Sequence, residues 1–122
     1  MEREAFEDLV ADAVDSIPDE FAEALVNVDV VVEDEPSQQD LDAGRVPPGH
    51  TLFGLYHGIP LTKRGNHYDR VLPDRISIYR GPIVRALRDP DRIKEQVRRT
   101  VIHEIGHYFG IEEDRLHELG WG

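Results

Sequence analysis

Two histidines and a glutamate near the carboxyl end of the chain have the types and the spacing of a metal site. His103 and His107 lie four residues apart, and Glu104 lies between them. In a helix, side chains at this spacing project from the same side, so both imidazoles can bind one zinc ion at about 2.0–2.1 Å. Glu104 lies on a neighbouring line of the helix. It is expected to act as a base toward a water on the ion, because zinc lowers the pKa of water to about 7.

The sequence around the motif argues against a chance match, although H-E-x-x-H arises by chance in roughly a few per thousand chains of this length. A chance match would be a surface helix that happens to carry two histidines and a glutamate. Here Asp89 and Pro90 predict a helix start, and Gly110 predicts its end. An apolar stripe is expected to form the buried side of this helix, opposite the histidines. Its members are Ile93, Val97, Val101, Ile105 and Phe109.

The stretch HEIGHYFGIEE, which begins at His103, resembles the extended zincin pattern H-E-x-x-H-x-x-G-x-x-H/D. The longer stretch HEIGHYFGIEEDRLHELGW, together with ISIYRGP at residues 76–82, resembles the small bacterial minimal-zincin family. Members of that family are single domains of similar length. The resemblance implies a zincin-like fold, one zinc ion per chain, and hydrolysis of a peptide or protein substrate with Glu104 as general base.

The same resemblance places the third zinc ligand at Glu113, three residues after Gly110. Related zincins have Asp or His at this position, and the glycine lets the chain turn back toward the histidines. A glutamate oxygen can bind zinc at about 2.0–2.2 Å. Asp114 and His117 are the alternative ligands. Glu113 and Asp114 could instead be acids that the dipole of a last helix favours.

A strand over residues 75–80 is expected before the active-site helix. In the zincin plan that the resemblance implies, an edge strand at this place binds the substrate backbone in antiparallel orientation. We therefore predict that Ile78, Tyr79 and Arg80 contact the substrate, although the segment would form sheet structure in any case.

Several other side chains invite a functional role but are expected to be structural or solvated. Tyr79 and Tyr108 could donate to an oxyanion, yet each is more typical of a half-buried aromatic residue. His50, His57 and His67 fall in expected loops or at strand ends, where a solvated histidine is more common than a metal ligand.

The expected elements form a single α+β domain over residues 1–122, in which a small mixed sheet of three to four strands packs on helices. Hydrophobic periodicity and breakers predict helices at residues 3–15, 19–25, 90–109 and 113–119, with a helical turn at 83–87. Strands are predicted at residues 26–33, 51–56 and 75–80. Residues 34–50 are expected to form a long acidic loop, and residues 63–66 a turn.

The composition excludes several classes of function. The chain has 122 residues, a formal net charge of -11 and no cysteine. Phosphate binding requires clustered Lys and Arg, so nucleic acid is not an expected partner. No apolar stretch approaches the roughly 18 residues of a membrane span, and the first residues lack the pattern of a signal peptide. The expected location is the cytoplasm, and no membrane partner is expected.

Two functions are compatible with these features. The first is a zinc-dependent peptidase. The second is a non-catalytic module in which the same scaffold binds metal for stability or binds a peptide or protein. Small size favours the module, because so short a domain has a shallow cleft. The intact Glu104 favours the peptidase, because a structural zinc site has no need of a base and usually has four protein ligands.

Overall fold

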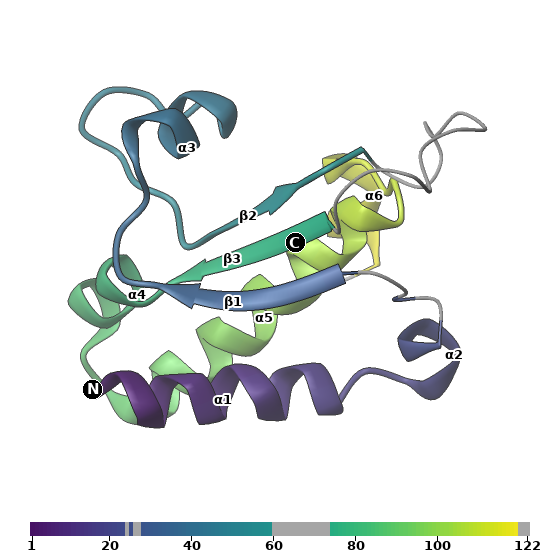
Figure 1. Cartoon of the computed structure of the whole chain (residues 1–122), viewed down its shortest axis with the longest axis horizontal. Coiled ribbons are helices and arrows are strands. Elements are labelled where there is room, and N and C mark those ends of the chain that lie inside the picture. Colours follow the sequence, from purple (N-terminus) through teal and green to yellow (C-terminus); the bar gives the residue numbers. More distant parts are fainter. Residues whose placement is uncertain (24, 26–27, 60–73, 120–122) are drawn as a thin grey trace.

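A three-stranded mixed sheet forms the centre of the fold (Figure 1). It consists of β1 (Val28–Glu33), β2 (Gly54–His57) and β3 (Asp74–Tyr79), in the order β1-β3-β2. β1 runs parallel to β3 and β2 runs antiparallel to it, so that Val30 and Tyr56 flank Ile76 on either side. The computed structural model describes residues 1–23, 25, 28–59 and 74–119.

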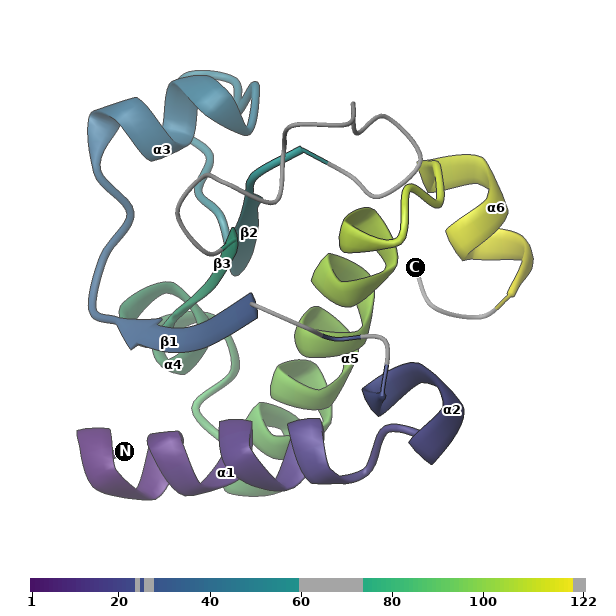
Figure 2. The same ribbon diagram turned by 45° about the vertical axis from the view of Figure 1, so that its right-hand side comes forward.

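Helices lie on both faces of this sheet (Figures 1 and 2). α1 (Arg3–Asp15) and α5 (Pro90–Tyr108) pack together on one face. α3 (Gln38–Ala43) lies over the opposite face, where its Asp40 accepts a hydrogen bond from the hydroxyl of Tyr79. The remaining helices in the described ranges are α2 (Asp19–Ala22), α4 (Arg80–Leu87) and α6 (Glu113–Glu118). This arrangement confirms the predicted α+β class with a small mixed sheet.

The hydrophobic core fills the space between the sheet, α1 and α5. Strand side chains alternate between faces, and β3 therefore directs Ile76 and Ile78 into the core, where both are fully buried. Each such side chain contributes about 1.5–3 kcal/mol through burial. Ile93, Val97, Val101 and Ile105 supply the α5 side of the core, and Phe6, Val10 and Ala13 supply the α1 side. The predicted apolar stripe is thus the surface that fixes α5 under the sheet.

Local signals fix both ends of α5. Asp89 is the N-cap residue by position, although its side chain makes no capping hydrogen bond. Pro90 follows it, at a position where the missing N–H of proline has no cost. At the other end Gly110 adopts a φ of 82°, which glycine reaches without strain. The N–H of Ile111 then donates to the carbonyl of Gly106 at 3.0 Å, and that of Gly110 donates to His107 at 2.9 Å. This Schellman arrangement turns the chain back toward α6.

Several predicted elements differ from the observed ones, and the second helix ends at Ala22 rather than at residue 25. Residues 34–50 are not a plain loop, because Ser37 and Asp40 form a capping box that starts α3. The helical turn expected at 83–87 is a longer helix that begins directly after β3 at Arg80. The second strand starts at Gly54 rather than at residue 51. The turn predicted at 63–66 and His67 lie outside the described residues.

The prediction that the strand before the active-site helix is an edge strand is wrong. β3 lies between β1 and β2 and is paired on both sides. Five of its six residues are buried, which is the pattern of a central strand covered on both faces. Of the described strands, β1 and β2 form the edges of the sheet. Among the described helices, none has the length and apolar character required to cross a membrane.

α6 packs against α5 at a glycine, where an added Cβ would require a buried leucine to move. Leu116 of α6 is fully buried, and a Cβ added at Gly106 would lie 2.3 Å from its Cδ2 atom. Gly106 lies inside the metal motif, one residue before His107. The contact therefore sets how closely the segment after the motif approaches the histidines.

We predict that Gly106→Ala destabilises the protein. Alanine favours a helix by about 0.8–1.0 kcal/mol relative to glycine, but overpacking against the buried Leu116 costs about 1–3 kcal/mol. The free energy of unfolding in urea should therefore fall. In a Leu116→Ala background the obstructing methyl group is absent, and Gly106→Ala should become neutral or stabilising. Equal effects in both backgrounds would show that this contact does not determine the packing of α6.

Candidate metal centre

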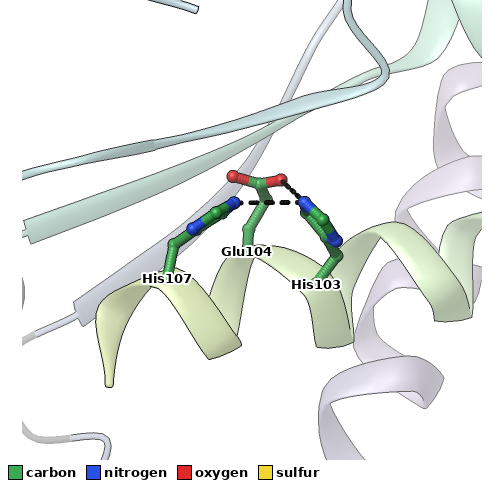
Figure 3. A group of neighbouring side chains, drawn as sticks. All are labelled: His103, Glu104 and His107. Atoms are coloured by element: carbon green, nitrogen blue, oxygen red, sulfur yellow. Dashed lines mark hydrogen bonds and ion pairs between the residues drawn. The ribbon is translucent and has the colours of Figure 1, made fainter. Parts of the chain in front are cut away.

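The last two turns of α5 bring His103, Glu104 and His107 together on the side of the helix that faces the strands (Figure 3). The Nε2 atoms of the two histidines are 3.1 Å apart, and their rings meet edge to face. Two nitrogen ligands bound at about 2.0–2.1 Å across a tetrahedral angle lie roughly 3.3 Å apart. The two imidazoles thus fit a shared zinc ion with almost no rearrangement.

Glu104 is buried, and the sheet orients its carboxylate. The backbone N–H of Tyr56 in β2 donates to Oε1 of Glu104 at 2.9 Å. The other oxygen, Oε2, lies 3.9 Å from Nε2 of His103, and Figure 3 shows the carboxylate between the two rings. Only 7% of Glu104 is exposed. One oxygen is therefore held by the strand while the other faces the place where both histidines converge.

A close approach of β2 to α5 makes this hydrogen bond possible. A Cβ added at Gly54 would lie 2.6 Å from Cγ2 of Thr100 and 3.3 Å from Cγ of Glu104. Tyr56 is fixed further along the strand, because its ring packs edge to face on Tyr108 and its hydroxyl donates to Asp74 at 2.6 Å. The backbone of β2 thus acts as a rigid support for Glu104.

A cleft of about 660 Å³ opens beside the motif. One wall is the segment from Gly49 to Gly54, which leads into β2. The other wall is α5, through Gln96, Arg99, Thr100, His103 and Glu104. The volume is within the roughly 300–1,000 Å³ of small-ligand sites, and two of the three motif residues, His103 and Glu104, lie at its wall. The arrangement can hold an extended ligand next to a metal ion and a base.

Comparison with known proteins agrees with this geometry. Residues 25–121 match the family of zincin-like metallopeptidases. The chain belongs to that family. Among solved structures, it is similar to a conserved hypothetical protein from Thermus thermophilus, with a TM-score of 0.59 and 23% sequence identity over 98% of this chain and 97% of the other. At that identity the likeness concerns the fold alone. No curated protein matches the sequence.

α6 carries the three residues considered as the third ligand in this zincin-like site. Glu113 is the first residue of the helix, where the turn at Gly110 leads, but its side chain lies outside the described part of the structure. Asp114 and His117 are both exposed. Neither belongs to the group of motif side chains whose ligand atoms lie within 4.8 Å of one another. The assignment to Glu113 stays a prediction.

The residues predicted to contact substrate lie away from the cleft edge. Ile78 and Tyr79 are fully buried in the central strand, and both sides of that strand are paired, so its backbone has no open edge for a peptide. Arg80 begins α4 and forms an ion pair with Asp34 at 3.0 Å. Strand addition by this segment is therefore excluded by the observed pairing.

Sequence reasoning missed the backbone of β2 and the surroundings of His57. The N–H group of Tyr56 carries no sequence signal, because every residue except proline has one. His57 is half-buried rather than solvated as expected, and its Nε2 lies 3.2 Å from Oγ of Ser77. His50 is exposed and lines the cleft. Tyr79 and Tyr108 are fully buried rather than half-buried.

We predict that the His103→Ala and His107→Ala double variant loses one zinc ion per chain relative to the parent. Each substitution removes one of two imidazoles that are already placed for the same ion. Metal analysis of protein purified without chelator measures the difference. His50→Ala, which removes an exposed histidine from the same cleft, is the matched control and should leave the zinc content unchanged. Identical zinc content in the double variant and the parent would contradict the site.

Proposed function

We propose that this chain is a zinc-dependent peptidase that hydrolyses a peptide bond in the cleft between β2 and α5. The observation that carries the proposal is that the two carboxylate oxygens of Glu104 have different neighbours. Its Oε1 accepts a hydrogen bond from the N–H of Tyr56, while its Oε2 faces the two histidines. A merely structural metal site would not need a buried acid oriented in this way.

The residues of the motif divide the chemistry between them. His103 and His107 would hold the metal ion. Bound zinc polarises a carbonyl group and lowers the pKa of water to about 7. Oε2 of Glu104 would accept a proton from the attacking water and return it to the leaving amine. Because Oε1 stays bonded to the strand, the carboxylate keeps its orientation through both transfers.

The outer edge of β2, which pairs with no described strand, is suited to hold the substrate backbone. Phe53 accepts a hydrogen bond from Tyr79 of β3, whereas the N–H of Tyr56 points to α5. Backbone groups of a strand alternate between its two edges. Gly54, two residues before Tyr56, therefore directs its N–H and carbonyl to the cleft that it lines. A peptide bound there by strand addition would place a carbonyl near the histidines.

We predict that Glu104→Gln retains zinc and loses peptide cleavage. The amide can still accept a hydrogen bond from Tyr56 but cannot take up a proton, so cleavage should fall by roughly 100- to 10,000-fold. A peptide library, read by mass spectrometry, measures cleavage. Glu95→Gln, on the exposed side of the same helix, is the control.

Two outcomes of this experiment would contradict the peptidase. If Glu104→Gln cleaves as well as the parent, the activity belongs to another site or to a contaminant. If the zinc-loaded parent cleaves no peptide in the library, the non-catalytic binding module is the better account of the same metal site.

We further predict that Glu113 supplies the third protein ligand. Glu113→Ala should then weaken zinc binding by more than a hundredfold, whereas Asp114→Ala and His117→Ala should each change it by at most about ten- to a hundredfold, as groups outside the ligand set do. Zinc titrations of the three variants at one pH decide the question. A collapse of affinity in Asp114→Ala or His117→Ala alone would move the ligand to that residue.

A further inference from the structure

A second group of metal-binding side chains lies on the face of the sheet opposite α5. Glu33 ends β1, Asp40 lies in α3, and His57 ends β2. One candidate ligand atom from each lies within 4.8 Å of the other two. The group sits above Ser77 and Tyr79 of β3, which are fully buried. Side chains from three elements that are distant in the sequence thus form one polar cluster.

One oxygen of this group lacks the partner that burial requires. Oε2 of Glu33 is buried and has no hydrogen-bond partner among the residues that the structure describes. Its neighbours in the group are a second carboxylate and an imidazole. Buried polar atoms are nearly always paired, and a buried carboxylate is costly unless a donor or a cation compensates it. A bound cation would provide that compensation.

Asp40 is held as an anion by hydrogen bonds to one of its two carboxylate oxygens. The hydroxyl of Tyr79 and the backbone N–H of Ser37 both donate to its Oδ2, at 2.9 and 3.2 Å. Burial alone would raise the pKa of Asp40, but these hydrogen bonds outweigh it and lower the pKa below its usual value. Both contacts use Oδ2, so Oδ1 remains for a ligand.

His57 has the properties of a neutral nitrogen ligand. Burial and the nearby guanidinium of Arg75 lower the pKa of its imidazole, which favours the neutral ring at pH 7. Nε2 contacts Oγ of Ser77 at 3.2 Å and, more distantly, Arg75 at 3.4 Å. A neutral imidazole keeps a lone pair on one of its two ring nitrogens, and that nitrogen can bind a cation. Histidine ligands in metal sites commonly donate their other ring N–H to a neighbouring acceptor.

We propose that Glu33, Asp40 and His57 form a second metal site that binds a divalent transition ion such as zinc. Two carboxylates and one imidazole suit such an ion better than Ca²⁺ or Mg²⁺, which prefer oxygen ligands alone. The three ligand atoms, which lie within 4.8 Å of one another, would close to the roughly 3.0–3.4 Å separations of a bound ion. The ion would tie α3 to β1 and β2, across the sheet from the motif on α5.

The experiment starts from the chain that carries both His103→Ala and His107→Ala, so that it is independent of the proposed peptidase site. Calorimetric titration of this chain with zinc, and separately with Co²⁺, should show one ion per chain. Adding His57→Ala should abolish that binding. Adding His50→Ala, a substitution of an exposed histidine before β2, should leave it unchanged.

The Glu33→Gln variant distinguishes loss of a metal ligand from loss of binding through misfolding. This change keeps the size of the side chain and removes the charge of the buried, unpaired oxygen, so the metal-free chain should be at least as stable as its parent. Zinc should raise the Tm of the parent background but not that of the Glu33→Gln variant, because only the former binds the ion in its folded state. α3 should stay in place without the ion, since Arg85 binds Glu35 of the preceding segment through two hydrogen bonds of 2.7 Å.

Either of two results would overturn the second site. The first is that the His103→Ala and His107→Ala chain binds neither zinc nor Co²⁺. The second is that it binds an ion whose affinity is the same after His57→Ala or Glu33→Gln. In both cases the cluster would serve only to position α3.

Discussion

The hydrogen bond from the backbone of Tyr56 to Glu104 joins the two halves of this fold. A carboxylate that is 7% exposed requires donors, and the sheet supplies one through a strand N–H at 2.9 Å. That bond is possible only if β2 lies close to α5, and Gly54 permits the approach because any larger residue would meet Thr100. The ladder with β3 places β2 in the sheet, and this contact ties the strand to α5 and directs the acid.

α5 has to satisfy two demands along a single helix. Its apolar stripe is buried against α1 and the sheet, while its last two turns must keep His103 and Glu104 at the wall of a cleft, with His107 beside them. The two demands are compatible because the motif lies at the end of the helix, where the Schellman turn at Gly110 redirects the chain. The same turn brings Leu116 onto Gly106, so the chain after the motif packs on the helix that carries the motif.

The features that sequence predicted are those encoded within a few residues of one another. The ends of α5 follow from Asp89, Pro90 and Gly110, and the motif follows from the four-residue spacing of its histidines, so both could be predicted from the sequence. The order of the strands could not be predicted, because an alternating apolar pattern specifies a strand but not its neighbours. β3 was therefore mistaken for an edge, and the N–H of Tyr56 gave no signal because backbone groups are common to all residues. The convergence of Glu33, Asp40 and His57 was also missed, because it depends on the strand order and on the positions of three separate segments, which local patterns do not specify.

The outer edge of β2 would have two uses if a peptide adds to it as proposed, and they limit each other. The N–H of Tyr56 is already bonded to Glu104, so a peptide added to this edge would find the groups of Gly54 but not that donor. A longer antiparallel ladder past Tyr56 would have to take this N–H from Glu104, and the buried carboxylate would lose a hydrogen bond worth about 1.5–3 kcal/mol. The proposed peptidase would therefore favour a substrate that pairs with the strand before Tyr56 and leaves the strand at the histidines. In that function the contact that orients Glu104 would also determine where the strand pairing of a bound peptide must end.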